Sequence, residues 1–139
     1  MMGWVGGVTM DVAARKGRVL IVDDQFLGVE FLRIWTEACG FTVCETAKTA
    51  DAAVAMALEH RPDIVLMDVQ LGPGGDGVTA AAEIARAITT RIIFVTGAND
   101  TATMKRIAAE APFAVLVKPI DPVELGLVLE RTMALGGMG

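Results

Sequence analysis

Ile64-Val65-Leu66-Met67-Asp68 is the stretch that decides the fold, together with the glycine-rich segment 69–77 that follows it. Four apolar residues in a row predict a strand that is buried on both faces, as in the middle of a parallel sheet. Glycines and a proline at 72–75 are turn residues, so the strand ends at Asp68. Because open α/β sheets bind ligands at the carboxyl ends of their strands, Asp68 is predicted to lie at a ligand-binding edge.

Apolar runs and helical patterns alternate along the rest of the chain. Short β-branched runs predict further strands at 18–22, 41–45, 91–95 and 114–117. Apolar residues at helical spacing predict helices at 27–38, 49–59, 78–88, 100–110 and 122–135. Strands that alternate with helices in this way form βαβ crossovers and hence a parallel sheet with helices on both faces. We therefore predict an α/β, flavodoxin-like (βα)5 doubly wound parallel sheet with strand order 2-1-3-4-5.

Several side chains are predicted to be structural. The helical spacing within 27–38 predicts one buried apolar stripe: Leu27, Phe31, Ile34, Trp35 and Ala38. Trp35 is thereby assigned to the core, and Cys39 and Cys44 are interpreted as small buried hydrophobic residues. His60 is interpreted as a solvated surface residue, and Asp76 as a brace for the loop before the third helix.

Composition limits the class of protein. The 139 residues suffice for one domain, and 53% of them are hydrophobic, which favours a packed core over disorder. Because the net charge is −5 and there is no basic patch, we do not expect direct nucleic-acid binding. Because the apolar runs are short, we do not expect membrane insertion. Two cysteines without a CxxC pattern suggest free thiols and a cytoplasmic protein. We expect an extension that adds nothing to the fold at 1–16, the domain at 17–135 and a short tail at 136–139.

Polar side chains stand at the carboxyl ends of four predicted strands. Asp23 and Asp24 follow the first strand, Asp68 ends the third, Thr96 follows the fourth and Lys118 follows the fifth. In a 2-1-3-4-5 sheet these four strands are neighbours. The sequence therefore predicts that three carboxylates, a hydroxyl and an ammonium group converge on one edge.

This group of residues suits phosphoryl chemistry. Three crowded carboxylates repel one another, and Lys118 neutralises only one of them. An oxygen-only ligand set favours Mg²⁺ as the remaining counter-charge. Metal, hydroxyl and lysine together can neutralise a phosphoryl group, and a carboxylate such as Asp68 can form an aspartyl-phosphate.

These five strand-end residues resemble the signature of the response regulator receiver domain, and the resemblance covers about residues 18–135. It implies that Asp68 accepts phosphate from a phospho-histidine on a histidine kinase or a histidine phosphotransfer protein. It also implies that Asp24 binds Mg²⁺ directly, that Asp23 binds it chiefly through water, and that the backbone carbonyl of Gln70 is a further ligand.

The resemblance also assigns the phosphate contacts. Thr96 and Lys118 would hold phosphoryl oxygens, together with the backbone N–H groups of Val69 and Gly97. The peptide bond between Lys118 and Pro119 would be cis.

The chain departs from the family at the switch position. Members usually carry Tyr or Phe three residues before the lysine, whereas this chain has Val115 there and no tyrosine at all. Thr96 and Val115 are the two switch positions. Val115 is short and stiff, and it has no ring that could move between an exposed and a buried position. We therefore expect the signal to travel through the backbone of 96–109 to the surface of the fourth helix, fifth strand and fifth helix. The segment 94–99 only partly resembles the Phe-Ala-Thr-Gly pattern of single-domain regulators that also lack the aromatic switch.

The leading hypothesis is a single-domain phosphoacceptor response regulator that is not a turnover enzyme and signals to an unknown output protein. A phosphorylation-independent pseudo-receiver that serves as a binding module is the alternative, and a homodimer is left open. A flavodoxin-like electron carrier would have a Ser/Thr/Gly-rich loop where this chain has Asp23-Asp24-Gln25. A phosphatase of the haloacid dehalogenase type would have a second Asp at Gln70.

Overall fold

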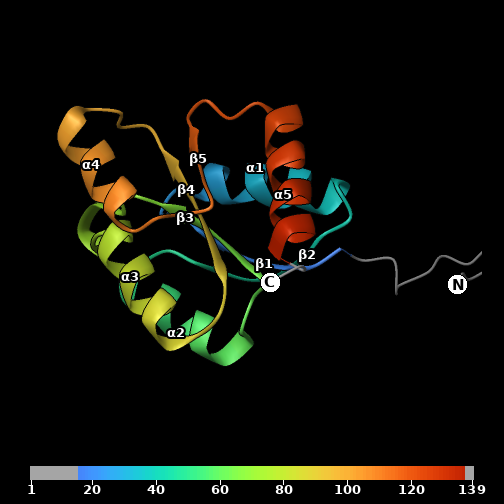
Figure 1. Cartoon of the computed structure of the whole chain (residues 1–139), viewed down its shortest axis with the longest axis horizontal. Helices are drawn as coiled ribbons and strands as arrows, with labels where there is room; N and C mark the ends of the chain where they lie inside the picture. Colours follow the sequence, from blue (N-terminus) through green and yellow to red (C-terminus); the bar gives the residue numbers. More distant parts are fainter. Residues whose placement is uncertain (1–15, 137–139) are drawn as a thin grey trace, which may run out of the picture.

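The computed structural model describes residues 16–136, in which five strands alternate with five helices (Figure 1). Residues 1–15 of the expected extension and 137–139 of the expected tail therefore lie outside the described residues, whereas Gly136, the first residue of the expected tail, is the last residue of α5. In chain order the elements are β1 (Arg18–Val22), α1 (Phe26–Ala38), β2 (Thr42–Ala47), α2 (Ala50–His60), β3 (Ile64–Asp68), α3 (Gly77–Ala87), β4 (Arg91–Thr96), α4 (Thr101–Ala109), β5 (Ala114–Val117) and α5 (Pro122–Gly136). A single 3-10 turn, Gly72–Gly74, lies between β3 and α3.

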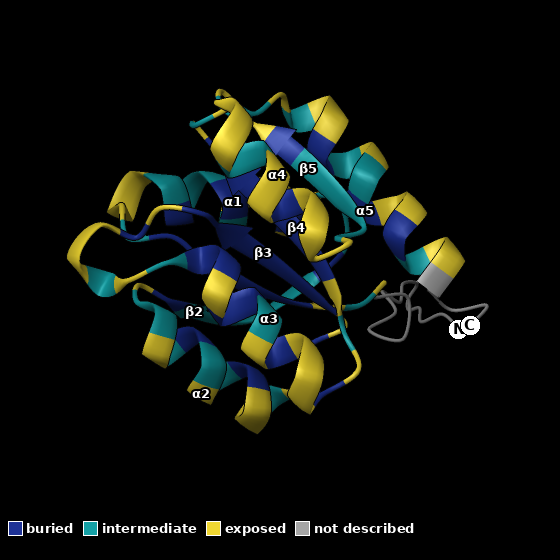
Figure 2. Ribbon diagram, turned by 60° about the vertical axis from the view of Figure 1, so that its left-hand side comes forward, coloured by how far each residue is buried: buried dark blue, intermediate teal, exposed yellow. Residues whose placement is uncertain are grey.

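All neighbouring strands are parallel, and their order is β2-β1-β3-β4-β5. This confirms the predicted doubly wound topology. β3 is the central strand and all five of its residues are buried, as its unbroken apolar pattern predicts (Figure 2). Asp68 is therefore the last residue of the most enclosed strand in the sheet.

The helices divide into two layers, one on each face of the sheet. Val29 and Leu32 of α1 pack with Leu125 and Leu129 of α5 over one face. α2, α3 and α4 cover the other face and share a second hydrophobic cluster. Each strand contributes alternate side chains to the two clusters, because successive side chains of a strand point to opposite faces.

The second strand differs slightly from its predicted range. β2 runs from Thr42 to Ala47, one residue later at its start and two later at its end than the expected 41–45. Phe41 lies just before the strand and is buried beneath α1 and α5. A bulge in the pairing of β1 with β2, between Val19 and Leu20, accompanies the longer strand.

The predicted buried stripe of α1 is wrong except at Phe31, which is half-buried against the core. The residues that α1 buries are Val29, Leu32 and Thr36, whereas Leu27 and Ile34 are exposed and Trp35 is 40% exposed. The helix carries apolar residues on most of its circumference, so the spacing fits more than one face. Which face turns inward depends on how α1 packs against the sheet and α5, and the helical pattern alone does not encode that packing.

α4 is attached to the fold by few contacts. Ile107 is the one residue that it buries fully, and Met104 is half-buried against the same cluster. Arg106 forms an ion pair with Asp76, which lies in the loop before α3. Of the helices between residues 16 and 136, none is long and apolar enough to cross a membrane.

Candidate functional site

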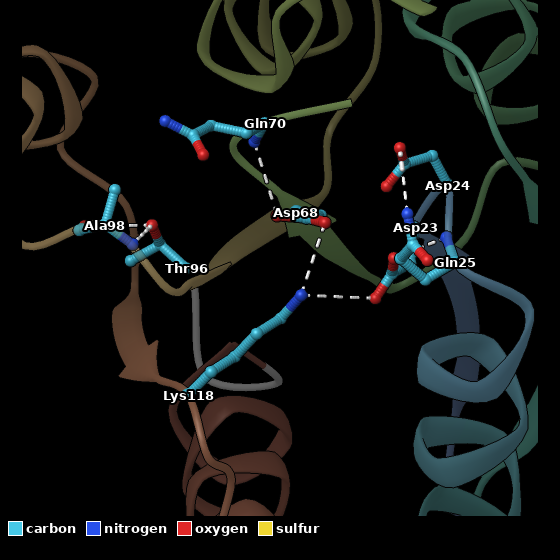
Figure 3. A network of polar contacts seen from close by, with 8 residues as sticks. All are labelled: Asp23, Asp24, Gln25, Asp68, Gln70, Thr96, Ala98 and Lys118. Carbon is cyan, nitrogen blue, oxygen red and sulfur yellow. Dashed lines mark hydrogen bonds and ion pairs between the residues drawn. The ribbon is translucent and has the colours of Figure 1, made fainter. Parts of the chain in front are cut away.

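The turn after β1 supplies two carboxylates with different exposure. Asp23 is fully buried, and its Oδ1 accepts a hydrogen bond from the backbone N–H of Gln25 at 2.9 Å. Asp24 is half-buried, and its Oδ2 lies 3.5 Å from the side-chain nitrogen of Gln25. Because β1 ends here and α1 begins at Phe26, both carboxylates face the sheet edge where β3 also ends (Figure 3).

Asp68 lies beside the two acidic residues that follow β1 and the lysine that follows β5 (Figure 3). It is 5% exposed, and its Oδ1 accepts a hydrogen bond from the backbone N–H of Gln70 at 3.3 Å. The ammonium group of Lys118 lies 3.3 Å from Asp68 Oδ2 and 3.5 Å from Asp23 Oδ2. Lys118 thus bridges the two buried carboxylates from the ends of β1 and β3.

Negative charge exceeds positive charge at this site. Carboxylate oxygens of Asp23, Asp24 and Asp68 all lie within 4.8 Å of one another. Burial raises the pKa of Asp68, and the charge of Asp23 raises it further, while Lys118 lowers it only in part. One ammonium group faces three carboxyl groups, all of them oxygen donors that suit a hard divalent cation. The residues therefore fit a metal ion, with the half-buried Asp24 on the side open to water.

Thr96 occupies the end of β4 but its hydroxyl is turned away from Asp68 (Figure 3). The hydroxyl donates to the backbone carbonyl of Ala98 and accepts from the N–H of the same residue, both at 2.9 Å. Thr96 is fully buried, so this local pairing satisfies a polar group that water cannot reach. Contact with a ligand on Asp68 requires these bonds to break.

The other predicted site residues lie around this edge. The N–H of Val69 donates to the carbonyl of Val95 at 3.3 Å, while Gln70 and Gly97 are exposed beside the carboxylates. The peptide bond between Lys118 and Pro119 is cis. Val115 lies in the middle of β5, half-buried against the cluster that α4 joins, rather than at the strand ends.

Two glycines that the sequence analysis did not assign to the site are required by close approach. A Cβ atom at Gly28, in the first turn of α1, would lie 2.4 Å from Asp23 Oδ2. A Cβ atom at Gly77, the first residue of α3, would lie 2.0 Å from the backbone carbonyl oxygen of Asp68. Both distances are too short for any real contact, so glycine is needed where α1 and α3 pass the two buried aspartates.

Asp76 braces the loop after β3, as predicted, and also connects that loop to α4. Its carboxylate caps α3 by accepting a hydrogen bond from the N–H of Val78 at 3.2 Å, and Thr79 donates to it at 2.8 Å. The same carboxylate pairs with Arg106. The sequence suggested a role for the acidic residue but carried no signal for its basic partner on α4.

The two cysteines and the histidine lie outside the site. Cys39 and Cys44 are free thiols and half-buried, so the prediction that they are buried holds only in part. Burial raises the pKa of the Cys44 thiol, which favours its unreactive protonated form. His60 is half-buried at the end of α2, with its Nε2 3.9 Å from carboxylate oxygens of Glu45 and Glu59.

The fold and the acidic edge are shared with a known family of receiver domains. Residues 19–130 match the response regulator receiver domain, and the chain belongs to that family. Protein-glutamate methylesterase/protein-glutamine glutaminase 2 of Anaeromyxobacter dehalogenans is 35% identical over 129 residues, covering 89% of this chain and 38% of that protein. Transcriptional regulatory protein PdtaR of Mycobacterium tuberculosis is 34% identical over 129 residues, covering 92% of this chain and 62% of that protein.

Solved structures show the same relationship. The signal receiver domain of a modulated diguanylate cyclase from Desulfovibrio desulfuricans has a TM-score of 0.82 at 34% identity, covering 88% of this chain and 97% of that one. A CheY-like receiver domain protein from Methanospirillum hungatei has a TM-score of 0.81 at 22% identity, which supports the fold alone. The chain spans less than two thirds of the curated relatives described above, and their similarity to it therefore concerns the receiver domain.

Proposed function

We propose that this receiver domain is a phosphoacceptor of a two-component system or phosphorelay, and that Asp68 takes the phosphoryl group. The observation that carries the proposal is the position of Asp68, with the ammonium group of Lys118 3.3 Å from its Oδ2 and oxygens of two further carboxylates within 4.8 Å. A nucleophilic carboxylate beside a fixed cation and a metal-binding cluster has the parts that phosphoryl transfer requires.

We propose that Mg²⁺ is held by Asp23, Asp24 and Asp68, with the backbone carbonyl of Gln70 as a further ligand. Mg²⁺ commonly keeps several waters and uses few protein carboxylates, which agrees with the half-buried position of Asp24. When bound, the metal would neutralise charge on the phosphoryl oxygens and on the carboxylates around them.

The proposed step is a displacement at phosphorus. A carboxylate oxygen of Asp68 attacks the phosphoryl group of a phospho-histidine on a histidine kinase or histidine phosphotransfer protein. The new P–O bond forms as the P–N bond breaks, and the released imidazole takes a proton from solvent. Lys118 is positioned to hold one phosphoryl oxygen, and the N–H groups of Val69 and Gly97 are proposed to hold others once the local bonds rearrange.

We propose that the signal leaves through the β4–α4 segment. Thr96 can reach a phosphoryl oxygen only after it gives up both bonds to Ala98, so binding to the phosphate pulls on the backbone at 96–98. α4 follows directly and buries only Ile107, so it can shift at low cost. The resulting change in α4, β5 and α5 would present a new surface to an output protein.

The test of phosphate acceptance is incubation with acetyl phosphate and Mg²⁺, followed by intact-mass measurement. We expect a gain of one phosphoryl group in the wild-type protein and none in Asp68→Asn. Asp63→Asn, an exposed carboxylate before the amino end of β3, is the matched control and should be phosphorylated like the wild type. No mass gain in the wild type, from acetyl phosphate or a phosphorylated kinase, would favour a phosphorylation-independent binding module.

The test of the switch is NMR with and without beryllofluoride and Mg²⁺. Backbone shifts should extend over 96–109, and Val115→Ala should leave most of them in place because no side chain at Val115 carries the signal. Shifts that stop at the residues touching the mimic, or that disappear in Val115→Ala, would contradict this route.

A further inference from the structure

A groove, here called the α1–α5 groove, lies between α1 and α5, where the two helices contact each other (Figure 1). Its volume is about 410 Å³, and its lining includes Trp35 and Cys39 from α1 and Val123, Gly126 and Leu127 from α5. A Cβ atom at Gly126 would lie 3.0 Å from the sulfur of Cys39, so glycine keeps the helices close at the floor. The groove therefore offers mainly apolar walls to whatever covers it.

Exposed apolar side chains are concentrated on the two helices that form the groove. Among the residues that the structure describes, nine large hydrophobic side chains are exposed, and seven of them belong to α1 or α5. Val123 and Leu127 lie one turn apart on α5, and both are exposed at the edge of the groove. Single exposed hydrophobic residues are ordinary, but a concentration around a hollow marks a surface that another apolar group covers.

The chain enters the domain at one end of the α1–α5 groove. The backbone N–H of Lys16 donates to the carbonyl of Gly40 at 3.0 Å, next to the lining residue Cys39. The ammonium group of Lys16 pairs with Glu130, which also lines the groove. Residues 1–15, which lie outside the described residues, are therefore attached beside this end of the groove.

One stretch of this attached segment has the pattern of an extended strand with a single apolar side. Val8, Met10 and Val12 alternate with Thr9 and Asp11. Alternate residues of an extended chain lie on the same side, and each residue rises about 3.3 Å, so the three apolar side chains span about 13 Å. The one charge in the stretch falls on the opposite side, where it can remain in water.

This span matches the length of the groove. Pro122 and Glu130 are the first and last lining residues on α5, and a helix rises about 12 Å over the eight residues that separate them. Three side chains about 6.6 Å apart can thus lie along a wall whose residues repeat about every 5.4 Å, one helical turn.

We propose that the stretch 8–12 lies in the α1–α5 groove as an extended strap, with Val8, Met10 and Val12 against its walls. The groove leads from Glu130 toward the start of α5, in the same direction as β1, so the chain must reverse within 13–15, and a tight turn needs no more residues than that. The sheet and both hydrophobic clusters are complete without the strap, which therefore covers a folded domain rather than building it.

The size of the groove favours a tethered occupant over a separate protein. A groove about 12 Å long, between helices whose axes are about 10 Å apart, is far smaller than the roughly 800 Å² that each partner buries in a specific interface. A segment joined to the domain by a few residues meets the groove at an effective concentration in the millimolar range. A contact too small to hold a free partner is therefore sufficient for this one.

The test is acrylamide quenching of Trp35 in the full chain. In a Trp4→Phe background Trp35 is the only tryptophan, and it lines the groove. Met10→Glu and Val12→Glu should each raise its quenching constant about twofold, as expected when a strap that is closed in half of the molecules is released. Thr9→Glu is the matched control, because it places the same charge on the polar side of the strap and should leave the quenching unchanged.

Two further measurements identify the occupant. Nuclear Overhauser contacts between the methyl groups of Met10 and Leu127 should appear in the wild-type protein, and circular dichroism should show the same fold in every variant. Quenching should not depend on protein concentration from the low micromolar to the submillimolar range. Quenching that decreases as concentration rises overturns the proposal, since a second copy then covers the groove. It is equally overturned if Met10→Glu leaves Trp35 as protected as before, or if Thr9→Glu exposes it as much as Met10→Glu does.

Discussion

Asp23 is held in a position that only a glycine at residue 28 permits. A Cβ atom there would lie 2.4 Å from Asp23 Oδ2 and 2.9 Å from its Cγ. Replacing a helical glycine with alanine ordinarily stabilises a protein by up to about 1 kcal/mol. We expect Gly28→Ala to destabilise this one instead, by about 1–2 kcal/mol, because the carboxylate must turn away from both Gln25 and Lys118.

A double-mutant cycle isolates that contact. In an Asp23→Ala background the carboxylate is absent, so Gly28→Ala should recover the usual stabilising effect of alanine in a helix. Urea denaturation of the four proteins gives the coupling between the two positions. Equal effects of Gly28→Ala in both backgrounds would show that the clash lies elsewhere.

The raised pKa of Asp68 makes a second prediction at the scale of single residues. Since burial favours the protonated form in the folded state, this carboxyl group stabilises the fold at low pH and loses that contribution as pH rises through its folded pKa. Without metal, Asp68→Asn should therefore exceed the wild type in unfolding free energy at neutral pH, by on the order of 1 kcal/mol. The difference should shrink as pH falls toward about 4, the ordinary pKa of aspartate. A difference that grows on acidification would contradict the assignment.

The polar strand ends could be predicted from the sequence, whereas the two site glycines could not. Asp23, Asp68 and Lys118 each follow a recognisable strand, and parallel topology alone brings such ends together. The need for glycine at Gly28 and Gly77 depends on how closely α1 and α3 pass the aspartates. That distance is a property of packing between segments, and nothing in the local pattern reports it.

At the scale of secondary-structure elements, α4 is the helix with the weakest attachment and the clearest electrostatic link to the site. Burial raises the pKa of Asp76, but hydrogen bonds from Arg106, Thr79 and the N–H of Val78 outweigh it and leave the pKa below its usual value. The folded state thus favours the charged form of Asp76. Its stabilising contribution is present above the ordinary pKa of aspartate and is lost as pH falls through the lowered one.

We predict that Arg106→Ala loosens α4 without unfolding the domain. Amide hydrogen exchange over 101–109 should become several-fold faster, while exchange in β1 and β3 stays unchanged. Lys105→Ala is the matched control, because it removes a neighbouring exposed charge of the same sign on the same helix. Equal acceleration in both variants would mean that the pair with Asp76 does not restrain α4.

α1 shows where helical periodicity reaches its limit. The buried set Val29, Leu32 and Thr36 has helical spacing, and so does the exposed set Leu27, Ile34 and Trp35. Periodicity identifies a helix reliably, but a helix with apolar residues on two sides does not reveal which side meets its own sheet. α5 likewise carries apolar residues on two sides, because Leu125 and Leu129 are buried whereas Val123 and Leu127 are exposed.

For the whole molecule, the order of the strands was predictable because the chain alternates strand and helix without interruption. Short connections and right-handed crossovers leave few arrangements for such a pattern. What the pattern leaves undetermined is the balance of charge at the completed edge, where three carboxylates meet one ammonium group. Repulsion among the carboxylates opposes folding, and a metal ion bound there would relieve it and so stabilise the whole domain.

We predict that Mg²⁺ raises the melting temperature of the wild-type protein and that Asp24→Ala removes this effect. At a tenfold excess over its dissociation constant, a ligand of the folded state adds about 1.4 kcal/mol to the free energy of unfolding. For a domain of this size, that raises the melting temperature by a few degrees. Without metal, Asp24→Ala should be at least as stable as the wild type, since it relieves repulsion among the carboxylates. Asp51→Ala, an exposed aspartate on α2, is the control and should keep the full response to Mg²⁺. An equal rise in melting temperature for Asp24→Ala, at matched ionic strength, would show that Mg²⁺ acts elsewhere on the molecule.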